Sequence, residues 1–152
     1  MGRAKVDLCH GHCFTARCYR AQIKEGIMTS LPKLCFATAA IFALIGMLWG
    51  IHMSATGDHL LSPAHGHLNL IGFVALSIFG TYYALTPAAA KSRLGMVHYV
   101  LTVVTVLMMA PGIVLAITDK GAFLAQISSV LGVATMGLFL FIILRHGVGA
   151  SK

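Results

Sequence analysis

Four long stretches of the chain contain no Asp, Glu, Lys or Arg, and this feature limits the possible folds more than any other. The stretches cover residues 34–53, 66–85, 96–117 and 122–144. Each reaches the roughly 20 residues with which a helix, rising about 1.5 Å per residue, crosses a hydrocarbon core of about 30 Å. Backbone polar groups in lipid must be satisfied within their own segment, so helices are the expected form. The sequence therefore predicts an all-α integral membrane protein with four transmembrane helices.

The composition supports this prediction. Of the 152 residues, 58% are hydrophobic and only 10% are charged, and the mean hydropathy is +0.87. Soluble domains carry about 25% charged residues. A chain of this size cannot hide so much apolar surface from water, so we expect its main surroundings to be a lipid bilayer.

The positions of the basic residues indicate an orientation in the membrane. Six of the 11 Lys and Arg residues precede the first stretch, two join the second to the third, two follow the fourth, and only Lys120 lies elsewhere. The positive-inside rule places both termini and the loop 86–95 in the cytoplasm, and the loops 54–65 and 118–121 outside. Short connections predict an up-down four-helix bundle. The net charge of +7 thus sets orientation and does not indicate a nucleic-acid partner.

Residues 1–33 form a separate, polar and basic tail. It contains the sequence Cys9-His10-Gly11-His12-Cys13, followed by Cys18. Soft ligands at this spacing allow a zinc or copper site, and a disordered tail is the other interpretation. Met28 offers a second translation start, which leaves open whether residues 1–27 belong to the native protein.

Two sequence patterns predict how the helices pack and where their ends lie. Small residues recur at helical spacing in the first and fourth stretches, which lets helices approach closely in lipid. These rows are Ala39, Ala43, Gly46 and Gly50, and Ala125, Ser128, Gly132 and Thr135. Tyr82, Tyr83 and Tyr99 fall near the inner ends of the second and third stretches, as expected of residues in an interfacial aromatic belt.

Histidines provide the only clear candidates for a site. His52 ends the first stretch and His67 begins the second, with His59 and His65 between them. His98 lies near the start of the third stretch, on the opposite side of the membrane from these four. The depths of His67 and His98 should differ by about 15–20 Å, but two imidazoles on one iron need ring nitrogens about 4 Å apart. His52 and His67 are therefore the expected pair, with His65 as a substitute for either.

Other interpretations of the histidines stay open. The side chains of His52, His59, His65 and His67 could together hold zinc, copper or iron without haem. Asp58 is a candidate for the carboxylate that holds the outer N–H of a ligating histidine. For His98, a hydrogen bond to a neighbouring helix and metal ligation are both open, and an interfacial histidine can also be a purely structural polar residue.

The second stretch resembles the second transmembrane helix of subunit I of the haem–copper oxidases, most closely in the nitric oxide reductase branch. Its opening reads His67-Leu68-Asn69-Leu70-Ile71-Gly72, and its exit reads Gly80-Thr81-Tyr82-Tyr83-Ala84-Leu85-Thr86-Pro87. The resemblance implies that His67 is an axial ligand of haem b near the outer face. The whole chain also resembles small four-span bacterial membrane proteins with a His-x-His-Leu-Asn-Leu motif, which implies a location in the bacterial inner membrane.

The chain also departs from that family. It has fewer spans than the large subunit, no His-Pro-Glu-x-Tyr segment and no His-His pair, so it does not encode a complete oxygen- or nitric oxide-reducing centre, and whether it is an enzyme stays open. We expect a small b-type cytochrome for electron transfer or binding of a diatomic gas, alone, as a homo-oligomer or within a respiratory complex. The alternatives are a non-haem metal protein and a cofactor-free accessory or assembly subunit of such a complex.

Overall fold

The computed structural model describes residues 30–149, and all regular structure in this part of the chain is helical. Within residues 30–149, four helical segments are long and apolar enough to cross a membrane: Leu31–Thr56, Ser62–Leu85, Arg93–Ile117 and Phe123–His146. For the described part of the chain, this confirms the prediction of all-helical structure with four such segments. Most of the segments extend beyond the charge-free stretches because polar residues at their ends form the first and last helical turns. The Cys/His sequence of the tail lies outside the described residues.

The second of these segments is divided by an unusual turn geometry. The elements in chain order are α2 (Ser30–Thr56), α3 (Ser62–His67), the π-helix η1 (Leu68–Ala75), α4 (Leu76–Leu85), the short α5 (Pro87–Ala90), α6 (Arg93–Ile117) and α7 (Phe123–His146). A π-helix of this length is rare, because such turns occur mostly as single bulges, frequently at functional sites. Here it begins directly after His67.

Local sequence signals explain where the helices begin and end. Prolines occupy the first turns of α3 and α5, where a missing N–H costs no intrahelical hydrogen bond. The Ser92 hydroxyl accepts a hydrogen bond from the backbone N–H of Gly95 at 3.1 Å and so caps α6. Gly147, with φ of 69°, ends α7 in the left-handed conformation that glycine adopts without strain.

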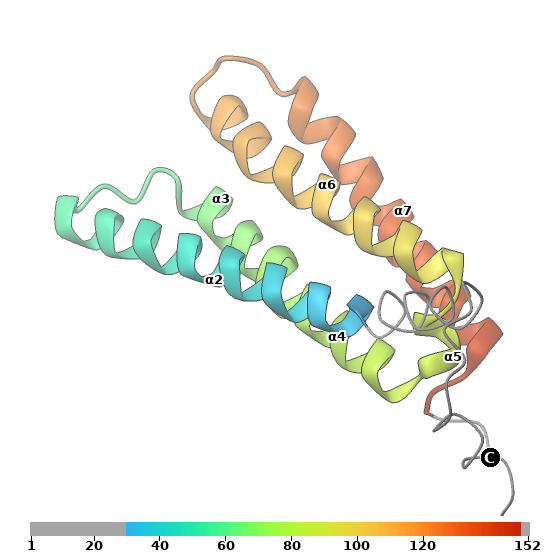
Figure 1. Ribbon diagram of the computed structural model, residues 1–152. Coiled ribbons are helices and arrows are strands. Elements are labelled where there is room, and N and C mark those ends of the chain that lie inside the picture. Colours follow the sequence, from blue (N-terminus) through green and yellow to red (C-terminus); the bar gives the residue numbers. More distant parts are fainter. Residues whose placement is uncertain (1–29, 150–152) are drawn as a thin grey trace, which may run out of the picture.

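Two helical hairpins make up the structure. Figure 1 shows α2 running beside η1 and α4, and α6 running beside α7. The hairpins meet near α5 and diverge toward the end that carries the connections 57–61 and 118–122, where α3 keeps its contact with α6. We call the end with residues 57–61 and 118–122 the loop end, and the end with residues 86–92 the α5 end.

The second helical segment holds the hairpins together, because its residues contact both α2 and α6. The buried core comprises Leu31, Cys35, Ala39, Phe42, Leu68, Leu76, Phe79, Tyr82, Tyr83, Ala89, Val106 and Ile142. The outer surface is also apolar: Leu48 is 68% exposed, Val133 76% and Leu144 77%. Such a surface is compatible with contact to lipid and unfavourable in water.

The rows of small residues pack within the structure, as predicted. In α2, Gly46 lies against the Asn69 side chain, and a Cβ on Gly50 would lie 3.2 Å from Cε1 of His65. In α7, Ser128 and Thr135 are buried, and the Thr135 hydroxyl lies 3.3 Å from that of Thr105 on α6. Small side chains thus allow the close approach that stabilises helix pairs in lipid.

The expectation of an aromatic belt was wrong for two tyrosines. Tyr82 and Tyr83 are only 7% and 1% exposed. Their hydroxyls bond within the protein, Tyr82 to the carbonyl oxygen of Gly147 at 2.9 Å and Tyr83 to His98. Position along a span does not reveal which face of the helix a residue occupies, and these two residues lie on the inner faces of α4.

Candidate functional site

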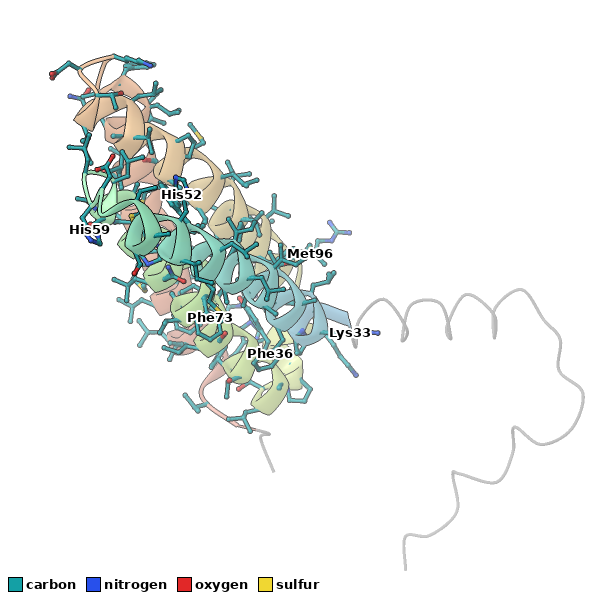
Figure 2. All side chains as sticks on the ribbon, turned by 90° about the vertical axis from the view of Figure 1, so that its left-hand side faces the viewer. Lys33, Phe36, His52, His59, Phe73 and Met96 are labelled. Carbon is teal, nitrogen blue, oxygen red and sulfur yellow. The ribbon has the colours of Figure 1, made fainter. Side chains whose placement is uncertain are left out.

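Four of the histidines lie at the loop end, the end at which the sequence analysis placed them. His52 is exposed near the end of α2, and His59 is exposed in the connection to α3. Figure 2 shows both at this end of the molecule. His65 and His67 belong to α3, where His65 is half-buried and His67 is exposed.

The ring of His67 is held by its own helix. Its Nδ1 lies 2.7 Å from the backbone carbonyl oxygen of Pro63, one helical turn earlier. A carbonyl oxygen can only accept a hydrogen bond, so Nδ1 carries the proton. In the neutral imidazole this leaves the lone pair on Nε2, away from the helix backbone. A hydrogen bond of this kind is the usual way in which proteins fix a ligating histidine.

His65 faces α2, the other helix of its own hairpin. Its ring packs on Gly50 and lies edge-on to Trp49, with the ring centroids 6.2 Å apart. Asn69, one turn later, fills the notch at Gly46 and donates a hydrogen bond to the backbone carbonyl oxygen of His65 at 3.0 Å. The two glycines of α2 are therefore spaced to receive the two polar side chains of the second segment.

A groove at this end is almost wholly apolar. It has a volume of about 490 Å³ and lies between α2, the start of η1 and the half of α6 nearest the loop end. Its lining is formed by Phe42, Ile45, Trp49, Leu68, Val106, Leu107, Ala110, Pro111, Val114 and Leu115. Leu68 follows His67 directly in the sequence, whereas the lining of this groove includes neither His67 nor His52.

The remaining polar groups at the loop end do not assemble a compact metal centre. Asp58 uses its carboxylate Oδ1 to accept a hydrogen bond from the backbone N–H of Leu60 at 2.9 Å. Within residues 30–149, no three His, Cys, Asp or Glu side chains come together in a group that could hold a metal ion. His52, His59, His65 and His67 are thus near neighbours in sequence without forming such a cluster.

His98 lies far from these residues, at the α5 end. It is completely buried, and its Nδ1 shares a hydrogen bond of 3.0 Å with the Tyr83 hydroxyl on α4. The ring stacks on Phe139 and meets Phe79 edge-on, with centroid distances of 5.3 and 4.6 Å. The hydrogen bond to a neighbouring helix, one of the two interpretations of His98, is confirmed. Its Nε2 has no partner among the described residues.

We expect the Tyr83–His98 bond to couple α4 to α6 energetically. Tyr83→Phe removes the hydroxyl and leaves Nδ1 of His98 unpaired, so the free energy of unfolding should fall. A cycle with His98→Leu and the double variant should give a coupling energy of about 0.6 kcal/mol, with about 1.7 kcal/mol as the upper range for hydrogen bonds between membrane helices. SDS-driven unfolding in mixed micelles measures it. If the effects of the two substitutions on the free energy of unfolding were fully additive, the hydrogen bond would contribute nothing to stability.

Two parts of this arrangement are missing from the sequence interpretation. Asn69 was noted only as part of a resemblance, although His65 and Asn69 share the four-residue spacing of Gly46 and Gly50, which is a usable signal. The aromatic surroundings of His98 had no such signal, because Phe79 and Tyr83 lie on α4 and Phe139 lies on α7, whereas His98 lies on α6.

Comparisons with protein families, with curated proteins and with solved structures find no match to this chain.

Proposed function

We propose that the protein is a small multi-pass membrane cytochrome that binds haem b at the loop end, with His67 as one axial ligand. The observation that carries the proposal is the hydrogen bond from Nδ1 of His67 to the Pro63 carbonyl oxygen. It fixes the tautomer whose Nε2 can bind iron, on a ring that is exposed at the mouth of the helix pair.

Haem suits these residues better than a bare metal ion does. A zinc or copper site in a protein takes three or four side chains, and residues 30–149 contain no such group. A porphyrin supplies four of the ligands itself, so one or two imidazoles are enough. The chain offers His67 and His52, which by residue count lie at similar depths, about 8 and 6 Å from the ends of their helices.

The apolar groove, which is lined by Leu68, the residue after His67, supports the same proposal. The porphyrin face of haem is large and apolar, and small-molecule sites are concave and lined mostly by hydrophobic and aromatic side chains. The groove is lined by Trp49, Leu68 and Pro111 among others, and polar atoms are nearly absent from its surface. These residues would exclude water from the ring, while His67 would hold it. Bound haem would supply one-electron chemistry or a site for a diatomic gas.

The arrangement of charge supports an orientation for this site. With both termini and α5 in the cytoplasm, the four segments form an up-down bundle and the loop end faces outward. In a bacterium this corresponds to the outer side of the cytoplasmic membrane. Haem would then lie near the outer leaflet, where it can exchange electrons with a respiratory partner.

The test is a pyridine haemochrome spectrum of the detergent-purified full chain, expressed with an ample supply of haem precursor. We expect a b-type spectrum with about one haem per chain. Colourless protein with stoichiometric zinc, copper or iron would favour a non-haem metal protein. Colourless, metal-free protein that co-purifies with a larger respiratory complex would favour an accessory or assembly subunit. Either result would overturn the cytochrome proposal.

His52 is the proposed second axial ligand. We expect His52→Ala to convert a low-spin, six-coordinate spectrum to a high-spin, five-coordinate one with little loss of haem, because His67 still binds the iron. Optical and electron paramagnetic resonance spectra measure the change, and His59→Ala serves as the control for a nearby exposed histidine. A low-spin spectrum in His52→Ala would mean that another residue supplies this bond.

A further inference from the structure

A groove distinct from the apolar one lies between α2 and the second helical segment. Its volume is about 440 Å³, and its lining is formed by Met47, Gly50, Ile51, Ser54, His65 and Asn69. It combines two exposed apolar side chains, Met47 and Ile51, with an imidazole, an amide and a hydroxyl. Concave sites with a few convergent polar groups on apolar walls are typical of small-molecule binding.

The imidazole of His65 has hydrogen-bonding capacity left toward this groove. Among the described residues, the Asn69 amide nitrogen lies 3.4 Å from Nδ1 and 3.3 Å from Nε2. An atom nearly equidistant from both ring nitrogens cannot lie along the in-plane direction of either, so neither contact is well aligned. The same amide donates a shorter bond, 3.0 Å, to the backbone carbonyl oxygen of His65. One donor and one acceptor of the ring therefore stay open to a ligand.

The depth of the groove restricts the ligand. The lining runs inward from Ser54 and His65, two and three residues from the ends of their helices, to Gly50 and Asn69, six and seven residues from them. At about 1.5 Å per residue this corresponds to about 3–10 Å. Charged groups are costly toward the inner end of this range, whereas an uncharged carbonyl or hydroxyl oxygen matches an imidazole and an amide. The acyl chain of a phospholipid has no polar atom there and would leave His65 unbonded.

We propose that this groove binds a quinone or quinol from the bilayer. The compound is an uncharged ring that carries carbonyl or hydroxyl oxygens on a long apolar tail. His65 bonds one ring oxygen, Met47 and Ile51 flank the ring, and the tail extends into lipid. Gly46 and Gly50 make the site by admitting Asn69 and His65 between the helices. The site uses neither His67 nor the apolar groove, so the inference is independent of haem binding.

Photolabelling tests this inference on the purified full chain in phosphatidylcholine nanodiscs. The probe is an azido-benzoquinone with a decyl tail, and the competitor is the unlabelled decyl-benzoquinone. Peptide mapping by mass spectrometry should find saturable labelling on residues 47–54 and 65–69, removed by the competitor. This readout does not depend on the colour of the protein, so a failed haem proposal and a failed quinone proposal are distinguishable.

Variants of His65 provide the decisive comparison. His65→Phe keeps an aromatic ring but removes its hydrogen bonds. It should lower the affinity for the competing decyl-benzoquinone by about fivefold, the equivalent of one net hydrogen bond. His65→Gln keeps a donor and an acceptor, so its affinity for the competitor should stay closer to that of the native protein. The control, His59→Phe, should have the affinity of the native protein. The proposal is overturned if His65→Phe binds as well as the native protein. It is also overturned if decylbenzene, which has no ring oxygens, competes as well as the quinone, since the groove would then hold an acyl chain only.

Discussion

Replacing His67 with alanine is expected to remove haem from the purified protein. The substitution deletes the imidazole whose Nδ1 is fixed by the Pro63 carbonyl oxygen. Loss of a residue that only supports a metal ligand typically costs 10- to 100-fold in affinity, so loss of the ligand itself should exceed about 100-fold. The haemochrome spectrum of the variant, compared with its protein concentration, measures the effect.

The result can be separated from a failure to fold. His67 is exposed, and alanine is the best helix former, so membrane insertion and elution of His67→Ala in detergent should match the native protein. His59→Ala, at an exposed histidine of the adjoining loop, should keep its haem. If His67→Ala retains haem at full stoichiometry with an unchanged spectrum, His67 does not bind the iron.

Gly112→Ala is expected to weaken the packing of α6 against α7 strongly. An added Cβ would lie 2.8 Å from the backbone nitrogen of Ala125 and 3.0 Å from the backbone carbonyl carbon of Leu124. A side chain can rotate away from such a contact, but the backbone of α7 cannot. Overpacking of this kind costs about 1–3 kcal/mol, and it outweighs the gain of up to about 1 kcal/mol from alanine's helix propensity.

Gly137→Ala is the matched control for this prediction. Gly137 lies in α7, and an added Cβ there meets no atom within 4 Å. Its free energy of unfolding should stay equal or rise. SDS-driven unfolding followed by circular dichroism measures both variants. Equal stability of the two would mean that α6 and α7 do not approach each other as closely as the structure shows.

The loop end illustrates how local spacing can predict a contact. Glycines at positions 46 and 50 and polar residues at 65 and 69 share one helical turn of separation, and two adjacent antiparallel helices bring such pairs face to face. The sequence interpretation treated the first pair as a packing row and the histidines as potential ligands. It did not join them, because the partner of a small-residue row cannot be identified from the row alone.

The α5 end shows the opposite situation. Tyr83 was expected at the membrane interface and is buried, since nothing in a uniformly apolar helix marks which face is turned inward. The burial of His98 against Phe79 and Phe139 depends on three helices at once. Contacts of that kind depend on the packing of the hairpins and leave no periodic trace in the chain.

The sequence by itself determined that residues 30–149 form four helical segments long and apolar enough to cross a membrane, and roughly where they end. That conclusion needs only the absence of charge over some twenty residues and the requirement that backbone groups in lipid bond within their own segment. The tertiary structure decided the notch that holds Asn69, the aromatic surroundings of His98 and the two grooves. In lipid, hydrophobicity does not distinguish one helix face from another, so only side-chain packing and hydrogen bonds between helices could choose among them.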